Sequence, residues 1–440
     1  MFKRLFQFGL LLAGISLLAA CTITFIPAHP LSDLSANVLL AIAVDPQGAK
    51  HIVGEDASTH QIVYLRTQLG SIEVKELLPL IPGWRPIALD MGVLDNGAVI
   101  MGWYEKNNTS PPKYRICVMI YPSASGVVCA AEFSDSPPNS FNPVVQVSTR
   151  GNIAYLIYSK QEGAQYTLRY EKVMGDVLTA GKVNWSASDP MVRTVNSVVD
   201  SAGYLHVVWY AEDGVGSGRV LYASNRSTDA SGNMTQNRTL LIAKSDPVNP
   251  PAIALYSTAG GERIAFAYVK DNSGSDDELY HQNGRVNNTD WSGEQKLNLT
   301  GGAYRLGDVH LVGVNNAYLI GFLRNNTNST PSEIWLRDAM GTIIQLTTNS
   351  CGERELQMLP AGGSFVMAYK RQPQSSEPRQ VLIYDQIRGE RLVYSEFCNS
   401  DNLGGEMAAS GDVVAGVWAQ CDRVWFSANA DLVYLPAVLK

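Results

Sequence analysis

Apolar and polar positions alternate along most of this chain, and the alternation is clearest in residues 198–224. Residues 204–210 are rich in β-branched and aromatic side chains, which is typical of a half-buried β-strand. A tight turn precedes them, in which Asp200 can bond its own backbone and Gly203 can adopt a positive φ. After a glycine-rich loop, residues 219–224 resume the strand pattern. The stretch therefore predicts three short antiparallel strands.

Weaker copies of this unit recur along the whole chain, and a fourth strand usually follows the third. An aromatic residue near the end of the second strand marks most copies: Trp103, Tyr158, Trp209, Tyr268, Phe322, Tyr369 and Trp418, with Gly54 in this place in the first unit. Four short strands repeated about every 50 residues predict an all-β fold, a β-propeller of four-stranded blades. We expect eight blades, with seven as the alternative if the first or last unit is split to close the ring.

The repeated unit begins at residue 38, so we expect a single propeller domain over residues 38–440, preceded by a lead-in at 21–37. Residues 1–20 are of a different kind. Lys3 and Arg4 are followed by an apolar run that is too short to span a bilayer comfortably. This is typical of a signal peptide.

The apolar run ends in Leu18-Ala19-Ala20-Cys21, which resembles the lipobox of bacterial lipoprotein signal peptides. The resemblance implies that the signal peptide is removed and that the Cys21 thiol carries the lipid that holds the mature chain to a membrane. A plain secretory signal that ends in a cysteine by chance is the alternative. We therefore expect a lipid-anchored protein on the extracytoplasmic face of a bacterial cell envelope.

Composition narrows the expected partners. The net charge is −7 and no basic run breaks that balance, so nucleic acid is not an expected partner. Charged residues make up only 17% of the chain against 45% hydrophobic residues, which indicates a globular protein with an uncharged, polar surface. The six histidines are scattered and no Cys-x-x-Cys pair occurs, so we expect no metal site and no cofactor.

The cysteines beyond the lipobox predict disulfides. Cys117 and Cys129 are placed symmetrically about a turn, so a hairpin there would bring them opposite each other in an oxidising compartment. We favour Cys398–Cys421 as a second pair, because both should lie on loops at one face of the last unit. Cys351–Cys398 is the alternative.

The pattern apolar-Asp-x-x-Gly-x-x-His-Val-Val-Trp at residues 199–209 is similar to repeats of the sialidase-like, Asp-box β-propellers. Their Asp box lies in the turn between the third and fourth strands, where this chain has residues 227–235, with one extra residue and no Trp after Thr235. The resemblance covers most of the mature chain. It implies the propeller fold and, as an alternative function, a sialidase-like glycoside hydrolase.

Sialidases hold the carboxylate of the substrate with arginines and use a Tyr/Glu nucleophile pair. Four arginines here precede first strands: Arg85, Arg193, Arg305 and Arg354. In a propeller those loops open at the mouth of the central channel, so the four are candidates to line one funnel and bind an anion such as a uronate or a sialate. The alternative is that they pair with nearby acidic residues in solvated loops. No Tyr/Glu pair is marked by a motif, and we assign no catalytic residue.

Other chemistry-bearing residues recur from unit to unit. Asp45, Asp95 and Asp200 recur at a turn, and His51 and His206 recur after it. Equivalent positions in different blades lie far apart, so we expect these residues to support the fold.

The expected function is a binding or scaffold module for a surface carbohydrate or another envelope protein. The sialidase-like hydrolase is the alternative, and a rigid docking disc in a structural assembly is a third hypothesis.

Overall fold

The structure is a computed structural model, and within its described residues the fold is all-β, with strands β1 to β33 and no helix. The description covers residues 29–30, 40–56, 59, 61–68, 71–78, 80, 82–122, 126–130, 132–134, 143–162, 165–174, 177–183, 191–212, 218–242, 250–270, 277–287, 290–299, 304–326, 332–348, 352–361, 363–372, 378–386, 389–396, 405–410, 413–420 and 423–428.

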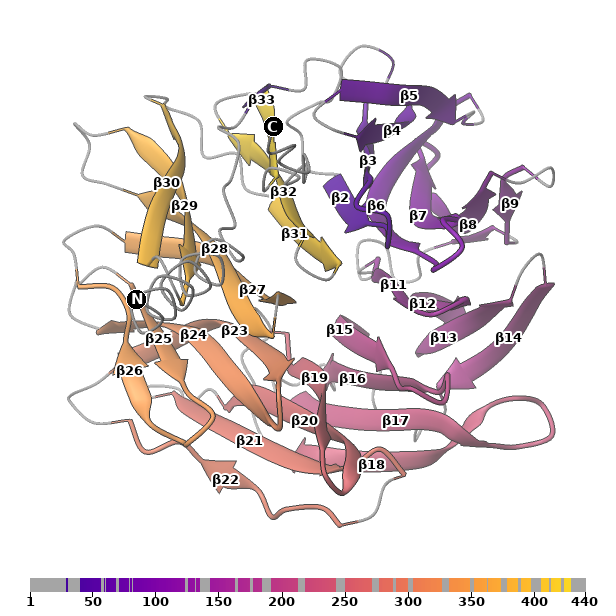
Figure 1. Cartoon of the computed structure of the whole chain (residues 1–440). Helices are drawn as coiled ribbons and strands as arrows, with labels where there is room; N and C mark the ends of the chain where they lie inside the picture. Colours follow the sequence, from indigo (N-terminus) through magenta and orange to yellow (C-terminus); the bar gives the residue numbers. More distant parts are fainter. Residues whose placement is uncertain are drawn as a thin grey trace, which may run out of the picture.

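The strands form antiparallel sheets that follow one another around a common axis, with the first strand of each sheet nearest the axis (Figure 1). In each sheet the following strands succeed one another toward the rim. The first sheet contains β2 (Leu40–Val44), β3 (Lys50–Glu55), β4 (Ile62–Gln68) and β5 (Ser71–Leu78). The second contains β6 (Trp84–Val93), β7 (Val99–Asn107), β8 (Lys113–Tyr121), β9 (Val128–Cys129) and β10 (Phe133–Ser134).

The next two units join at the rim into one eight-stranded sheet, because β14 and β18 pair in parallel through Val183 and Met234. The first half contains β11 (Val145–Arg150), β12 (Ile153–Glu162), β13 (Gln165–Met174) and β14 (Val177–Val183). The second half contains β15 (Met191–Val199), β16 (Leu205–Glu212), β17 (Gly218–Thr228) and β18 (Met234–Ile242).

Three separate four-stranded sheets follow. The first contains β19 (Ala252–Thr258), β20 (Gly261–Lys270), β21 (Glu278–Arg285) and β22 (Gln295–Lys296). The second contains β23 (Tyr304–Val314), β24 (Ala317–Asn326), β25 (Glu333–Arg337) and β26 (Ile343–Gln345). The third contains β27 (Gly352–Ala361), β28 (Ser364–Gln372), β29 (Arg379–Asp385) and β30 (Gly389–Glu396).

The last sheet combines both ends of the chain. It contains β31 (Gly405–Ser410), β32 (Val413–Gln420), β33 (Arg423–Ala428) and, as its outer strand, β1 (His29–Pro30). Pairing of the earliest strand with the latest one closes the ring.

Contacts between first strands run in the order β2, β6, β11, β15, β19, β23, β27, β31 and back to β2. This arrangement confirms the prediction of an all-β, multi-blade β-propeller, and the blade number stays a prediction.

The hydrophobic core lies between neighbouring sheets. One cluster joins Trp209 and Tyr155 of consecutive units, and another joins Phe322 to Tyr256. Sheets approach so closely that a Cβ on Gly102 would lie 2.2 Å from Cδ1 of Leu156. The marker aromatics therefore pack between neighbouring blades, in agreement with their regular spacing along the chain.

Candidate functional site

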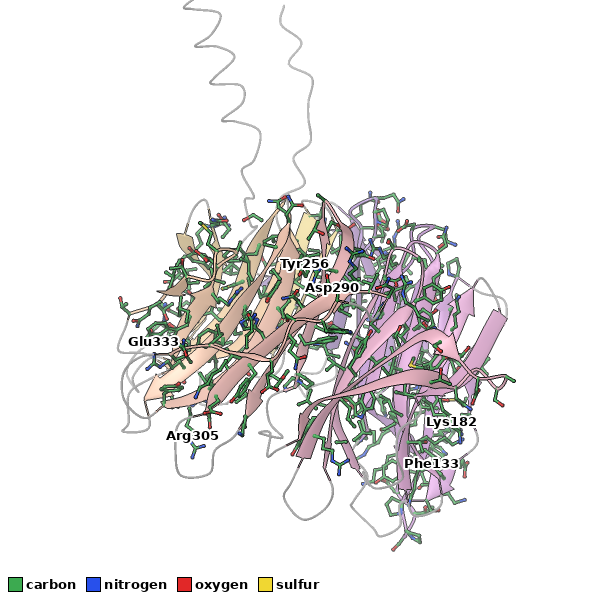
Figure 2. All side chains as sticks on the ribbon, turned by 90° about the horizontal axis from the view of Figure 1, so that it is seen from below. Phe133, Lys182, Tyr256, Asp290, Arg305 and Glu333 are labelled. Carbon is green, nitrogen blue, oxygen red and sulfur yellow. A yellow bond between two sulfur atoms is a disulfide. The ribbon has the colours of Figure 1, made fainter. Side chains whose placement is uncertain are left out.

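First strands begin, and second strands end, on one side of the ring, which we call the arginine face. Arg85, Arg305 and Arg354 lie near the starts of β6, β23 and β27, and each is exposed. Figure 2 shows Arg305 at the lower edge of the molecule, away from Tyr256 and Asp290 on the upper side. That opposite side carries the turns between first and second strands, and we call it the turn face.

The backbone register separates the predicted arginines. Arg85 pairs with Lys106 and Arg305 with Asn325, three residues beyond the marker aromatic in both sheets. Arg354 pairs with Lys370, only one residue beyond its marker, and therefore lies closer to the sheet interior. In the order of first strands, β6 and β23 lie on opposite sides of the ring, whereas β23 and β27 are neighbours. Arg193 lies on β15, and its side chain is outside the described residues.

The exposed arginines differ in their partners. Nη1 of Arg305 is 3.0 Å from Oδ1 of Asp277, and the other carboxylate oxygen accepts the Leu306 N–H at 2.8 Å. Asp277 is buried, so this pair fixes the start of β23 to the preceding sheet. Within the described part of the chain, the side chains of Arg85 and Arg354 have no hydrogen bond or ion pair.

Four first strands carry a register shift near the arginine face, in β6, β15, β23 and β27. In two of these bulges a non-glycine residue has a positive φ: 44° at Asp308 and 50° at Glu355. Oδ2 of Asp308 accepts the Leu356 N–H at 3.1 Å, and Lys370 Nζ is 2.8 Å from the Glu355 carboxylate. Burial raises the pKa of Asp308, and the nearby charge of Glu355 raises it further. Such conformations cost energy and concentrate at functional sites.

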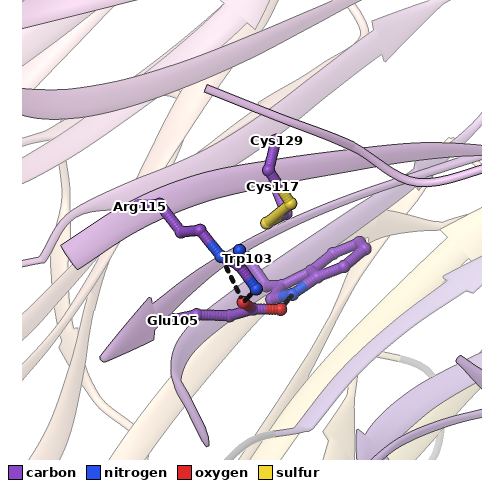
Figure 3. The surroundings of a disulfide bond; sticks show 5 residues. All are labelled: Trp103, Glu105, Arg115, Cys117 and Cys129. Atoms are coloured by element: carbon purple, nitrogen blue, oxygen red, sulfur yellow. Dashed lines mark hydrogen bonds and ion pairs between the residues drawn. A yellow bond between two sulfur atoms is a disulfide. The ribbon is translucent and has the colours of Figure 1, made fainter. Parts of the chain in front are cut away.

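A buried cluster of Trp103, Glu105 and Arg115 lies beside the strand that presents Arg85 (Figure 3). The Glu105 carboxylate accepts Trp103 Nε1–H at 2.8 Å and Arg115 Nε–H at 2.6 Å. The Arg115 guanidinium lies 4.3 Å from the ring centroid of Trp84, the residue before Arg85. This cation–π contact and the buried ion pair hold the start of β6 in place.

The disulfide predicted beside this cluster is present: Cys117 and Cys129 are opposite each other on β8 and β9 and are joined by an S–S bond. Glu105 and the two sulfur atoms lie within 4.8 Å of one another, the kind of grouping that can bind a metal. Because the sulfur atoms are bonded to each other, they are not thiolates and do not serve as metal ligands in this state. The predicted second pair, Cys398–Cys421, and its alternative, Cys351–Cys398, lie outside the described residues, as does Cys21.

The recurring Asp and His residues form the same network twice on the turn face. His206 Nε2 is 3.0 Å from Oδ2 of Asp200, and its Nδ1 is 2.7 Å from the Tyr222 hydroxyl. His51 has the same two partners in the first sheet, Asp45 at 3.2 Å and Tyr64 at 2.7 Å. A carboxylate can only accept, so Nε2–H donates to it and Nδ1 of the neutral ring accepts the tyrosine proton.

The network agrees with a structural role. Asp200 Oδ1 also accepts the N–H groups of Ala202 and Tyr204 across the turn that Gly203 makes at a φ of 80°. Burial lowers the pKa of His206, although the Asp200 hydrogen bond opposes the shift, so the ring is neutral. The prediction that these residues support the fold agrees with this geometry.

Tyrosine–glutamate contacts also recur, which bears on the hydrolase hypothesis. The marker tyrosines Tyr158 and Tyr268 donate to Glu171 at 3.0 Å and Glu294 at 2.8 Å, and Tyr369 donates to Glu390. Burial is the largest cause that raises the pKa of each tyrosine, and the glutamate raises it further. A raised pKa disfavours the phenolate, so these contacts resemble supports between strands more than activated nucleophiles.

Sequence reasoning missed a ring of residues on the first strands, which we call the inner ring. Each member pairs in register with the residue just before the marker position, and six of the eight are polar. The members are Ala41, Asp90, Gln146, Asn196, Ala252, His310, Gln357 and Glu406. A polar residue within the first strand is the available signal, and it is not specific, because first strands such as β11 contain several polar residues.

Inner-ring side chains bind the next sheet. Oδ2 of Asp90 accepts the Val147 N–H at 2.7 Å, and Oε2 of Glu406 accepts the Ile42 N–H at 3.0 Å. Nε2 of Gln146 donates to Asn196 Oδ1 at 3.2 Å. The ring thus ties successive blades together near the axis.

Among the described residues no helix is long and apolar enough to cross a membrane. No protein-family description matches the chain. No curated protein matches it either.

Solved structures with β-propeller-like folds do match. Prolyl oligopeptidase B from Galerina marginata, bound to a macrocyclization substrate, is 10% identical with a TM-score of 0.51, over 88% of this chain and 56% of that one. A prolyl endopeptidase studied for interdomain dynamics is 13% identical with a TM-score of 0.51, over 88% and 53%. This chain therefore spans about half the length of those proteins. At such identities the likeness shows the fold alone.

Proposed function

We propose that this chain is a lipid-anchored, extracytoplasmic β-propeller of a bacterial cell envelope that binds an acidic surface carbohydrate through its arginine face. An envelope protein with an acidic surface is the other partner that this face suits. The lipobox-like Leu18-Ala19-Ala20-Cys21 supports the anchor, and the disulfide Cys117–Cys129 is in keeping with an oxidising compartment.

The observation that carries the binding proposal is the state of Arg85 and Arg354. Both are exposed, and neither side chain has an ion pair or hydrogen bond within the described part of the chain. A planar guanidinium binds a carboxylate through two parallel hydrogen bonds, which suits uronates and sialates. Arg85 and Arg354 are therefore the predicted arginines on which we expect a ligand to act.

We also propose kinship with the Asp-box propellers. In the turn between β17 and β18, Asp229 Oδ1 accepts the N–H groups of Ser231 and Asn233, each at 2.9 Å. Asp338 caps the corresponding turn between β25 and β26 in the same way, through Met340 and Thr342. An Asp with this capping role at the Asp-box place in two blades supports the relationship.

The binding test compares acidic glycans with the same glycans after reduction of their carboxyl groups to alcohols. The protein should bind the acidic forms and lose most of this binding after reduction. Arg85→Ala and Arg354→Ala should each weaken binding about tenfold, the usual loss for a charged hydrogen bond. Arg285→Ala is the matched control, since Arg285 is exposed on the turn face beside Asp290. Equal binding to reduced and acidic glycans would contradict the proposal.

The anchor is tested separately by labelling cells with a fatty-acid probe. The protein should incorporate the label, and Cys21→Ser should abolish incorporation. A sialidase-like hydrolase is the alternative function, tested by turnover of fluorogenic sialosides and uronides by the intact protein. Turnover that is lost in Arg85→Ala would replace the binding proposal with the enzyme.

A further inference from the structure

Arg85 has a second cation beside it on the neighbouring strand. The backbone register places Arg85 of β6 directly opposite Lys106 of β7. Side chains that are opposite each other on two antiparallel strands lie on the same side of the sheet, with Cβ atoms about 5 Å apart. Arg85 is exposed and Lys106 is half-buried, so neither charge is shut off from solvent.

Within the described part of the chain, neither of these two cations forms an ion pair with an acidic side chain. The ammonium of Lys106 lies over the Tyr114 ring, 5.6 Å from its centroid. The adjacent acid is Glu105, and successive side chains of a strand point to opposite faces of the sheet. On that other face Glu105 accepts hydrogen bonds from Arg115 and Trp103. The described acids therefore leave both positive charges uncompensated.

The corresponding positions in two other sheets do have an acid. Arg305 is opposite an uncharged residue, and its Nη1 is 3.0 Å from the Asp277 carboxylate. Arg354 is opposite Lys370, whose Nζ is 2.8 Å from the Glu355 carboxylate. Like charges directly opposite each other destabilise a sheet. The sheet that begins with β6 therefore bears a cost that a bound anion would remove.

We propose that Arg85 and Lys106 form a subsite for a phosphoryl group carried by the surface carbohydrate. This inference rests on the proposed function and adds a doubly charged group to the ligand. A phosphate monoester has a charge of about −1.5 to −2 near neutral pH and three strong acceptor oxygens. The planar guanidinium binds two of these oxygens in parallel, and the ammonium acts as a point charge beside the third. A carboxylate would neutralise only one of the two cations.

The two exposed arginines then differ in what they select. At Arg354 the opposite lysine already has the Glu355 carboxylate, so a single positive charge is left for a ligand. That position suits a carboxylate, as in a uronate or a sialate. The position of Arg85 suits the phosphate, because two positive charges meet there.

The test compares three probes in calorimetric titrations of the intact protein: glucose phosphorylated at its primary hydroxyl, the methyl diester of that phosphate, and glucuronate. They carry a doubly charged phosphate, a singly charged phosphate and a singly charged carboxylate on the same carbon. The monoester should bind at least about fivefold more tightly than the diester, because it alone neutralises both cations. Equal binding of monoester and diester would overturn the subsite, whereas failure of all three probes to bind would also contradict the proposed function.

Lys106→Met removes the charge and keeps an unbranched stem over Tyr114. The preference for the monoester should disappear in this variant, while glucuronate still binds, and Lys106→Arg should restore the preference. Lys113→Met is the matched control, because Lys113 is exposed on β8 of the same sheet and its Nζ is 3.2 Å from Glu132. A preference that survives in Lys106→Met, or that is lost equally in Lys113→Met, would overturn the assignment to Lys106.

Free phosphate and membrane lipids offer the same chemical group, and two further measurements separate these sources. Inorganic phosphate should displace the phosphorylated glucose only at higher concentrations than the sugar phosphate itself, because it lacks the contacts of the sugar ring. The Cys21→Ser protein, which lacks the proposed anchor, should bind vesicles with phosphatidic acid no better than vesicles of phosphatidylcholine alone. Inorganic phosphate that binds as tightly as the sugar phosphate, or clear selection of phosphatidic acid, would overturn the assignment to a carbohydrate.

Discussion

The turn face and the arginine face of this propeller are built differently. On the turn face one network is used twice, and the positive φ angles lie in turns, at glycines such as Gly48 and Gly203 and also at Asn315. On the arginine face, Asp308 and Glu355 take positive φ angles inside first strands, where the register shifts. We infer that residues repeated from sheet to sheet, such as the Asp–His–Tyr network, stabilise the fold. Residues that differ between sheets, such as the exposed arginines, are the candidates for binding a partner.

Near the arginine face, the acidic and basic members of a cross-strand pair exchange strands between two sheets. In the sheet that begins with β6, Glu105 on β7 faces Arg115 on β8, whereas in the sheet that begins with β23, Arg324 on β24 faces Glu333 on β25. An aromatic residue receives the guanidinium in both cases, since Arg324 lies 4.4 Å from the Tyr304 ring. The packing is retained while the charge pattern varies, and because Glu105, Arg115 and Arg324 are buried, this variation concerns the support of the strand starts.

The largest effect is expected from Asp200→Ala on the turn face. The substitution removes two backbone hydrogen bonds and leaves His206 and Arg226 without their shared carboxylate. We expect a loss of about 3–5 kcal/mol in the free energy of unfolding, measured by urea denaturation. Asp45→Ala should cost about 1 kcal/mol less, because Arg66 is 4.0 Å from Asp45 and also pairs with Glu73. A loss below about 1 kcal/mol for Asp200→Ala would contradict a stabilising role for this network.

The second-largest effect is expected from acidification, which should lower the free energy of unfolding through His281. Burial lowers the pKa of His281, which is bonded to the Tyr318 hydroxyl at 2.8 Å, to about 4. Between about pH 6.5 and about pH 4, His281 is protonated in the unfolded chain but remains neutral in the folded chain. The stability that this group contributes above its ordinary pKa of about 6.5 is therefore lost as the pH falls toward 4. We expect up to about 3 kcal/mol from this group. The difference in unfolding free energy between wild type and His281→Gln isolates it from the carboxyl groups, and it should shrink as pH falls.

Much of the fold could be predicted because each repeated unit contains residue patterns that can be recognised over short stretches of sequence. The column from Trp103 to Trp418 marks the second strands, and Asp-x-x-Gly marks the turns. The inner ring could not be found in this way, because residues such as Gln146 and Glu406 become equivalent only once the register is known. Tertiary pairing, not propensity, defines that ring.

The site was harder to predict for a related reason. The sequence shows which arginines precede first strands, but it does not show which of them forms an ion pair with a carboxylate. Asp277 precedes Arg305 by 28 residues, and only the approach of neighbouring sheets makes them an ion pair. A two-residue difference in register likewise moves Arg354 inward relative to Arg85.

Arg305→Ala should have an intermediate effect on stability. The change leaves the buried Asp277 carboxylate with the Leu306 N–H but without its guanidinium partner. Because the Arg305 side chain is 44% exposed, we expect a loss of about 1–2 kcal/mol in urea denaturation. Arg305→Lys, which keeps a charge near Asp277, should recover part of it. No loss in either variant would mean that Arg305 is as free as its neighbours.

The smallest effect on stability is expected from Arg85→Ala, and it gives the sharpest contrast between the faces. Arg85 is exposed and has no partner in the described part of the chain, so its removal should change the free energy of unfolding by less than about 0.5 kcal/mol. Its neighbour Trp84 keeps the strand start in place through Arg115. The same variant should lose most binding to acidic glycans, while Asp45→Ala, at temperatures where it is folded, should bind them normally. A stability loss in Arg85→Ala as large as that in Arg305→Ala would show that the arginine face also serves the fold.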